Sequence, residues 1–122
     1  MVGALARGEI WLIALDPSVG SEIRKTRPCV VVSPDDIHNH LRTALVAPMT
    51  TGARAAPFRI GVSFQGKSGL ILLDQMRAVD KARLMQRLGS LDGDTLEQTL
   101  IVLRELFETF AKFLFPRQPK SN

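Results

Sequence analysis

The sequence predicts a single, mainly β domain that forms a small, strongly twisted barrel closed by one C-terminal helix. Its length of 122 residues suits one domain. The first two thirds contain short apolar runs separated by turn residues, and the last third contains one long stretch with apolar residues at three- and four-residue spacing. A series of short strands followed by one helix favours a small barrel over a parallel sheet.

Six segments have the composition of strands: 9–15, 28–32, 43–49, 58–64, 70–73 and 85–88. The first is rich in Ile, Trp and Leu and is ended by Asp16-Pro17. The second begins with Pro28, which is tolerated at the first residue of a strand. Residues 58–64 alternate apolar and polar side chains, which predicts a half-buried antiparallel strand.

Helical segments are expected at three places. Ser33-Pro34-Asp35-Asp36 opens one turn before Asn39, and Asp80 caps a short turn through Leu84. Asp94, with Glu97 three residues later, has the pattern of a capping box at the start of the long helix. The apolar stripe of that helix consists of Leu96, Leu100, Leu103, Phe107, Phe110 and Leu114. The helix is expected to end near Phe115-Pro116, and the tail from about 116 to 122 is expected to be frayed.

The composition excludes several classes of protein. No run approaches about 20 apolar residues, so no membrane span is expected. Residues 1–15 include Arg7 and Glu9, which argues against a signal peptide and favours a cytoplasmic protein. The single cysteine, Cys29, is expected to be buried and, with only His38 and His40 near it, does not supply the four ligands of a structural zinc site. A net charge of +4, spread along the chain, is only weakly in favour of a nucleic-acid partner.

Two local patterns resemble sites without having the required context. Gly61-x-x-x-x-Gly66-Lys67-Ser68 matches the letters of a nucleotide-binding P-loop, but no helix is predicted after the serine. Residues 65–69 are therefore expected to be a hairpin turn. His38 and His40 have no third catalytic partner in the sequence, so they are expected to be solvated loop residues.

A cationic cluster directly precedes the second predicted strand. Arg24, Lys25 and Arg27 stand there with Glu22 and Thr26. The cluster suits either a solvated charged turn or a phosphate site, because an arginine fixed at a strand end can hold a phosphate with two hydrogen bonds. The residues of this loop alone leave both interpretations open.

Two other predicted strands end in polar residues. Met49-Thr50-Thr51 closes the third strand, and Asp74-Gln75-x-Arg77 closes the fifth. In a small barrel such ends can gather on one rim with Arg27, which resembles a phosphodiester site. The alternative for Asp74 is a carboxylate paired with an arginine in a purely structural role.

A series of short motifs resembles, in order, the MazF/PemK family of toxin endoribonucleases, from about residue 7 to the final helix. The motifs are Arg7-Gly8-Glu9-Ile10-Trp11, Leu15-Asp16-Pro17, Gly20-Ser21-Glu22, Thr26-Arg27-Pro28-Cys29-Val30-Val31, Val46-Ala47-Pro48-Met49-Thr50, Leu73-Asp74-Gln75-Met76-Arg77 and Val79-Asp80-Lys81-x-Arg83-Leu84. The resemblance implies an SH3-like barrel of the plasmid-maintenance-toxin (CcdB/Kid-like) type and a homodimer. It also implies sequence-specific, metal-independent cleavage of single-stranded RNA, no cofactor, and neutralisation by a cognate MazE-like antitoxin.

The resemblance also implies roles for individual residues. Arg27 and Thr50 match the catalytic arginine and threonine of the family, and Glu22 and Asp74 match acidic positions that are candidates for the general base. The expected RNA contacts come from the loop and strand ends around them, namely Ser21, Arg24, Lys25, Thr51, Arg54, Gln75 and Arg77.

Two other functions are weighed against this one. A gyrase-directed toxin of the same fold need not retain Arg27 and Thr50, and both are present. A non-catalytic SH3-like module uses exposed aromatic residues, whereas this chain has no Tyr and has Trp11 in a predicted core strand. Phe113 lies off the apolar stripe of the long helix, so it and Phe115 suit either extra core packing or a contact with a second copy or an antitoxin.

Overall fold

The computed structural model describes residues 4–114 and the side chains of residues 4–108. Within this range the strands are β1 (Glu9–Ala14), β2 (Thr26–Val31), β3 (Thr43–Thr50), β4 (Arg59–Phe64), β5 (Lys67–Leu72), β6 (Arg77–Asp80) and β7 (Leu84–Ser90). The α-helices are α1 (Asp35–His38) and α2 (Gly93–Leu114), and the 3-10 turns are η1 (Leu73–Gln75) and η2 (Lys81–Arg83).

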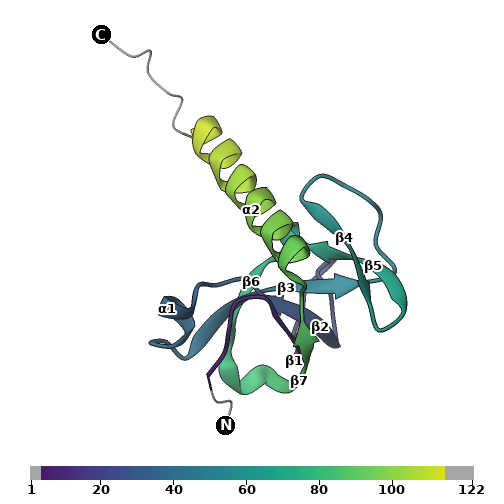
Figure 1. Cartoon of the computed structure of the whole chain (residues 1–122), viewed down its shortest axis with the longest axis vertical. Coiled ribbons are helices and arrows are strands. Elements are labelled where there is room, and N and C mark those ends of the chain that lie inside the picture. Colours follow the sequence, from purple (N-terminus) through teal and green to yellow (C-terminus); the bar gives the residue numbers. More distant parts are fainter. Residues whose placement is uncertain (1–3, 115–122) are drawn as a thin grey trace.

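The strands form one strongly curled antiparallel sheet in the order β4-β5-β3-β2-β1-β7, with β6 paired to β3 outside that path. The long strand β3 connects three other strands of the sheet. Its first half pairs with β6, its middle with β2 and its last two residues with β5. Figure 1 shows the curled sheet with α2 leaving it, so that the far end of α2 projects beyond the strands. The predicted fold class, mainly β with one C-terminal helix in a barrel-like arrangement, is confirmed.

The predicted strands are confirmed with small changes at their ends, and β6 is an addition. Residues 77–80 have one buried apolar side chain, Val79, so their sequence contains little strand signal. They are held as a strand by pairing with Thr43–Val46 of β3. That pairing depends on a partner more than 30 residues away in the sequence, which no local pattern reveals.

The continuous apolar run of β2 results from burial on both faces of the sheet. Cys29 and Val31 pack in one hydrophobic cluster with β1, β3 and β6, whereas Val30 and Val32 pack in a second cluster with β5 and α2. Cys29 is fully buried as predicted, and this burial raises the pKa of its thiol to about 12. The thiol therefore stays protonated and unreactive at neutral pH.

The predicted turn at residues 65–69 is too long. The turn consists of Gln65 and Gly66 alone, and Lys67 already pairs with Phe64 in the β4–β5 hairpin. Both turn residues have positive φ, 51° and 76°, as a two-residue hairpin with a right-handed twist requires. Lys67 and Ser68 lie in a strand, so the rejection of the P-loop is confirmed.

The expectation that His38 is solvated is wrong. Its side chain is fully buried, with Nδ1 2.9 Å from Ser33 Oγ and Nε2 2.9 Å from the carbonyl oxygen of Leu5. The single turn of α1 directs the ring inward, where it joins the N-terminal segment to the barrel. His40 is exposed, as expected.

The capping residue of α2 is Asp92, and the prediction of Asp94 is wrong. The Asp92 carboxylate accepts hydrogen bonds from the backbone N–H of Thr95, at 2.7 Å, and from the Thr95 hydroxyl, at 3.1 Å. Asp94 lies inside the first turn, where a negative charge is favourable for the helix dipole. Two possible capping patterns overlap here, Asp92 with Thr95 and Asp94 with Glu97. The sequence prediction used the second pattern and therefore placed the start of the helix two residues too late.

Helix α2 packs on the sheet through its first half. Leu103 is buried, whereas Phe107, one turn later, is 56% exposed. The side chains of Phe110 and Phe113, Phe115, and the tail lie outside the described residues, so the expectations for them stay untested. None of the helices in the described part of the chain has the length and apolar character needed to cross a bilayer.

Candidate active site

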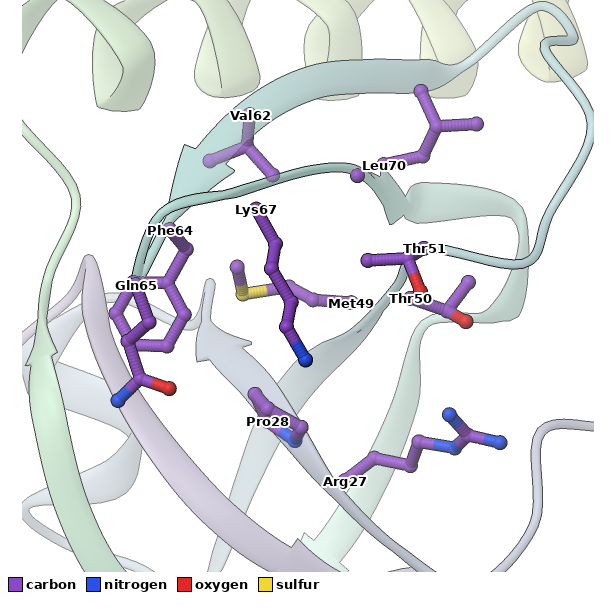
Figure 2. Close-up of a pocket in the computed structure, with 11 residues that line it drawn as sticks. Arg27, Pro28, Met49, Thr50, Thr51, Val62, Phe64, Gln65, Lys67 and Leu70 are labelled. Atoms are coloured by element: carbon purple, nitrogen blue, oxygen red, sulfur yellow. The ribbon is translucent and has the colours of Figure 1, made fainter.

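The antiparallel pairing of β2 and β3 brings two of the predicted site residues together. Cys29 pairs with Pro48, and Arg27 and Thr50 each lie two residues beyond that pair, at the same end of the sheet. Both residues line a cavity of about 210 Å³ that is open to solvent, together with Thr51. Figure 2 shows the Arg27 guanidinium and the two threonine side chains gathered at one end of this cavity.

The contacts of Arg27 and Thr50 leave their reactive groups available to a ligand. Arg27 donates from Nε to the carbonyl oxygen of Arg24 at 3.3 Å, and no described carboxylate forms an ion pair with it. The Thr50 hydroxyl oxygen accepts a hydrogen bond from the Gly52 N–H at 3.2 Å, which orients it and leaves its own proton free to donate. A fixed guanidinium beside a hydroxyl donor is suited to binding a phosphate.

The other predicted strand end lines a second cavity, of about 200 Å³. Its lining includes Glu22, Asp74, Gln75 and Arg77. Consecutive residues of β3, Pro48 and Met49, line the second and the first cavity respectively. The strand ends expected on one rim are therefore divided between two adjoining cavities.

Asp74 forms a two-pronged ion pair with Arg59, a residue that the sequence reasoning did not single out. Arg59 donates from Nε to Oδ1 at 3.0 Å and from Nη2 to Oδ2 at 2.9 Å. These hydrogen bonds hold the pKa of Asp74 below its usual value. Arg59 also donates to the carbonyl oxygen of Arg54, so the pair connects η1, β4 and the loop before β4.

Gln75 and Arg77 both hold the loop between β1 and β2. Gln75 Oε1 accepts a hydrogen bond from the backbone N–H of Ile23 at 2.8 Å. Arg77 Nη1 donates to the carbonyl oxygen of Leu15 at 2.9 Å. These contacts fix both ends of the loop that contains Glu22.

The other predicted RNA-contact residues are exposed: Thr51 at the first cavity, Arg54 in the loop before β4, and Ser21, Arg24 and Lys25 on the β1–β2 loop. Glu22 is also exposed, and its carboxylate accepts a hydrogen bond from the backbone N–H of Val19 within the loop. Arg24 Nη2 donates to the carbonyl oxygen of Gly20 at 2.9 Å. Internal hydrogen bonds therefore shape the loop while its cations remain in solvent.

The sequence reasoning missed the contribution of the β4–β5 hairpin to the first cavity. Val62, Phe64, Gln65 and Lys67 all line it. The alternation of residues 58–64 does predict that Phe64 and Val62 lie on the same face of their strand. The sequence does not indicate that this face borders the cavity that contains Arg27. Among the described residues, no group of three or more His, Cys, Asp or Glu side chains is arranged to hold a metal ion.

The curled sheet, the single C-terminal helix and the open cationic cavity at the strand ends define a small barrel-like protein with a candidate anion-binding site. The family model described as PemK-like, MazF-like toxin of type II toxin–antitoxin system matches residues 6–107. The chain belongs to this family.

Individual relatives agree with this assignment. Endoribonuclease PemK of Escherichia coli is 36% identical over 102 residues, which cover 79% of this chain and 77% of that protein. Endoribonuclease EndoA of Bacillus subtilis is 32% identical over 98 residues, which cover 75% of this chain and 84% of that protein. Among solved structures, MazF from Deinococcus radiodurans has a TM-score of 0.76 at 25% identity and covers 88% of this chain and 99% of its own. An endoribonuclease in complex with its cognate antitoxin, from a mycobacterial species, shares the fold with a TM-score of 0.69 at 20% identity, covering 95% of this chain and 100% of its own.

Proposed function

We propose that this toxin cleaves single-stranded RNA, including messenger RNA, at a short recognition sequence and so inhibits translation and growth. Family membership and the two endoribonucleases related to it make the chain a toxin endoribonuclease. The observation that carries the proposed site is the open cavity in which Arg27, without a described carboxylate partner, lies at the same strand end as Thr50. The gyrase-directed alternative has no comparable support.

In the proposed reaction the nucleophile is the 2′-hydroxyl of the RNA. Its oxygen forms a bond to the adjacent phosphorus, the bond from phosphorus to the 5′-oxygen breaks, and the products have a 2′,3′-cyclic phosphate and a 5′-hydroxyl. The guanidinium of Arg27 stabilises the negative charge that develops on the phosphate oxygens. The Thr50 hydroxyl donates to one non-bridging oxygen. No metal ion is needed, because the attacking group is already part of the substrate.

We assign the general base to Glu22. An arginine, with a pKa of roughly 12.5 or more, is a poor base at neutral pH. Both oxygens of Asp74 accept hydrogen bonds from Arg59, and its lowered pKa makes it a weaker base. Glu22 lines the same second cavity from the β1–β2 loop, so the 2′-hydroxyl that it deprotonates has to lie where that cavity meets the first one, beside Pro48 and Met49 of β3. The proton that it removes from the 2′-hydroxyl is balanced by one delivered to the leaving 5′-oxygen, from solvent or from a protonated side chain.

The exposed residues around the cavity would bind the RNA. Arg24, Lys25 and Arg54 contact phosphates in a salt-sensitive manner, and Ser21 and Thr51 donate hydrogen bonds. Gln75 and Arg77 act mainly by holding the β1–β2 loop, as their hydrogen bonds to Ile23 and Leu15 indicate.

We propose two protein partners, an antitoxin and a second copy of the chain. Complexes of MazE with MazF from Deinococcus radiodurans support a cognate antitoxin for this toxin, and we propose that both act in the cytoplasm. A homodimer is supported by the exposed Phe107 and by a cavity of about 320 Å³ beside it, which Leu100 and Leu103 of α2 line together with Val32 and Leu45. Sedimentation of the antitoxin-free protein tests the dimer, because a monomer at micromolar concentration would contradict it.

The experiment that tests the activity is cleavage of a long single-stranded RNA by the antitoxin-free protein in excess EDTA, with both new ends mapped. We expect discrete cuts at one short recurring sequence, with 5′-hydroxyl ends and loss of activity in Arg27→Ala. The loss should be about 10²- to 10³-fold in kcat, as for removal of one charge-stabilising donor. Absence of cleavage by folded wild-type protein, or products with 5′-phosphate ends, would contradict the proposal.

A further inference from the structure

We infer that the far end of the first cavity is a nucleobase subsite, in which the base of a nucleotide flanking the cut stacks on Phe64 while Lys67 binds the adjoining phosphate. The inference rests on the proposed function, because it extends the same cavity from the reacting phosphate to a neighbouring base. Its residues are supplied by the β4–β5 hairpin, to which none of the predicted catalytic or RNA-binding residues belongs.

The two ends of the cavity differ in chemistry. Figure 2 shows Arg27, Thr50 and Thr51 at one end and Phe64 with the Gln65 amide at the other. Lys67 lies between them and directs its amine toward Pro28, in the middle of the cavity. A nucleotide has the same arrangement, with a charged phosphate at one end and a flat, mostly apolar base bearing polar edges at the other.

The hairpin holds Phe64 in a defined position. The tight turn at Gln65 and Gly66 pairs Phe64 directly with Lys67, so the ring and the ammonium group come from opposite sides of one two-residue turn. A Cβ built on Gly89 of β7 would lie 3.7 Å from Phe64 Cε1, so the ring packs closely beside that strand. The ring is only half-buried, which leaves part of it to the cavity.

The charge of the cavity favours RNA as its occupant. Among the described residues, neither Arg27 nor Lys67 has a carboxylate partner, so two cations face one open cavity with no compensating charge. Single-stranded RNA suits both the two cations and the Phe64 ring, because its phosphates pair with cations and its unstacked bases stack on aromatic side chains. Gln65, at the rim beside Phe64, has an amide that can hydrogen-bond the edge of a stacked base.

The test uses the recognition sequence found by mapping the cuts of the wild-type protein in a long RNA. Phe64→Leu keeps the apolar volume and removes the ring, and Lys67→Gln keeps the length and removes the charge. We expect each variant to raise KM by about tenfold, the size typical of one stacked base or one lost phosphate contact. Phe64→Leu should also relax the base preference at one position beside the cut, an effect that loss of packing alone does not produce. Lys67→Arg should restore the KM.

The matched controls are Phe58→Leu, in the same hydrophobic cluster but outside this cavity, and Lys81→Gln, in η2. Both should retain the wild-type KM and base preference. Because Lys67 is exposed, its variant keeps the proposal testable even where Phe64→Leu unfolds.

Three results would overturn the subsite. Unchanged KM and unchanged base preference in both hairpin variants, with a wild-type protein that cleaves, would remove the subsite and leave the proposed function intact. An effect confined to inhibition by the antitoxin would assign this end of the cavity to that protein instead. A folded wild-type protein that does not cleave RNA would remove the proposed function and the subsite together.

Discussion

At the scale of single residues, the position of Thr50 depends on a glycine in the neighbouring strand. A Cβ built on Gly69 of β5 would lie 2.8 Å from the Thr50 carbonyl oxygen and 3.2 Å from its carbonyl carbon. Backbone atoms cannot rotate away as a side chain can, so any larger residue would push the end of β3 outward. Gly69 thus permits the close approach of β3 and β5 that directs Thr50 into the cavity.

Gly69→Ala is therefore expected to lower kcat. A displacement of the order of 1 Å at a reacting group can cost about 10²-fold. Gly61→Ala, in the same hairpin, is the matched control, because a Cβ there would meet nothing within 4 Å. It should leave kcat unchanged and raise the free energy of unfolding by about 0.5–1 kcal/mol, since alanine has less conformational freedom in the unfolded chain. Equal rates in the two variants would show that the close approach is unimportant.

The ion pair of Asp74 and Arg59 predicts a particular pH dependence of stability. The folded-state pKa of Asp74 is depressed, so the pair contributes stability above the unfolded-state pKa, about 3.9, and loses it as the pH falls through the folded-state value. Asp74→Asn should lower the melting temperature at pH 7, and this difference should shrink at pH 3. Thermal unfolding of both proteins at the two pH values measures it. A difference that is the same at both values would mean that the pair contributes nothing through ionisation.

At the scale of elements, the β1–β2 loop is held by contacts from the segment that follows β5. Because Gln75 accepts from the backbone N–H of Ile23, Gln75→Met should leave that amide without its partner while keeping the volume of the side chain. Hydrogen exchange at Ile23 should then become at least tenfold faster, whereas the amides of β2 should exchange as before. Cleavage should lose kcat/KM without a matching loss of stability. Unchanged exchange at Ile23 would show that this bond does not hold the loop.

Elements with a strong local pattern could be predicted from the sequence, and those defined by distant partners could not. The alternation of residues 58–64 and the Asp80 cap, which accepts from the Ala82 N–H at 2.8 Å, are both observed. Strand β6 and the burial of His38 depend on partners in β3 and near residue 5, which no local pattern contains. The proximity of Arg27 and Thr50 could be predicted, because both lie at the ends of predicted strands. The contribution of Phe64 and Lys67 depends on how far the sheet curls, which the sequence pattern does not specify.

At the scale of the whole molecule, we expect the cations of the β1–β2 loop to give the toxin a salt-dependent affinity for RNA. The chain has a net charge of +4, and Arg24 and Lys25 are exposed on the loop directly before β2. The logarithm of RNA affinity should fall linearly with the logarithm of salt concentration, by about 0.7 per phosphate contact on a single strand. The double variant Arg24→Gln, Lys25→Gln should therefore have a slope smaller by about 1.4, with kcat at saturating RNA little changed. An unaltered slope would place the phosphate contacts elsewhere.

The architecture as a whole joins a structural sheet to the strand end of the candidate site. Strand β3 contributes buried residues to both hydrophobic clusters and ends in Thr50, so the same strand that stabilises the barrel positions the hydroxyl. The packed core of the barrel therefore supports the strand end at which we propose that the phosphate binds.

The most direct test of the account is the single-turnover rate of cleavage of two short RNAs in excess EDTA. Both span one mapped site, and they differ only in a 2′-deoxyribose on the 5′ side of the cut. We expect that the all-ribose RNA is cleaved, that the deoxy-substituted RNA binds with similar affinity but is not cleaved, and that Arg27→Ala cleaves the all-ribose RNA about 10²- to 10³-fold more slowly. Cleavage of the deoxy-substituted RNA at the same position would contradict it, because the attacking group would then be water instead of the 2′-hydroxyl.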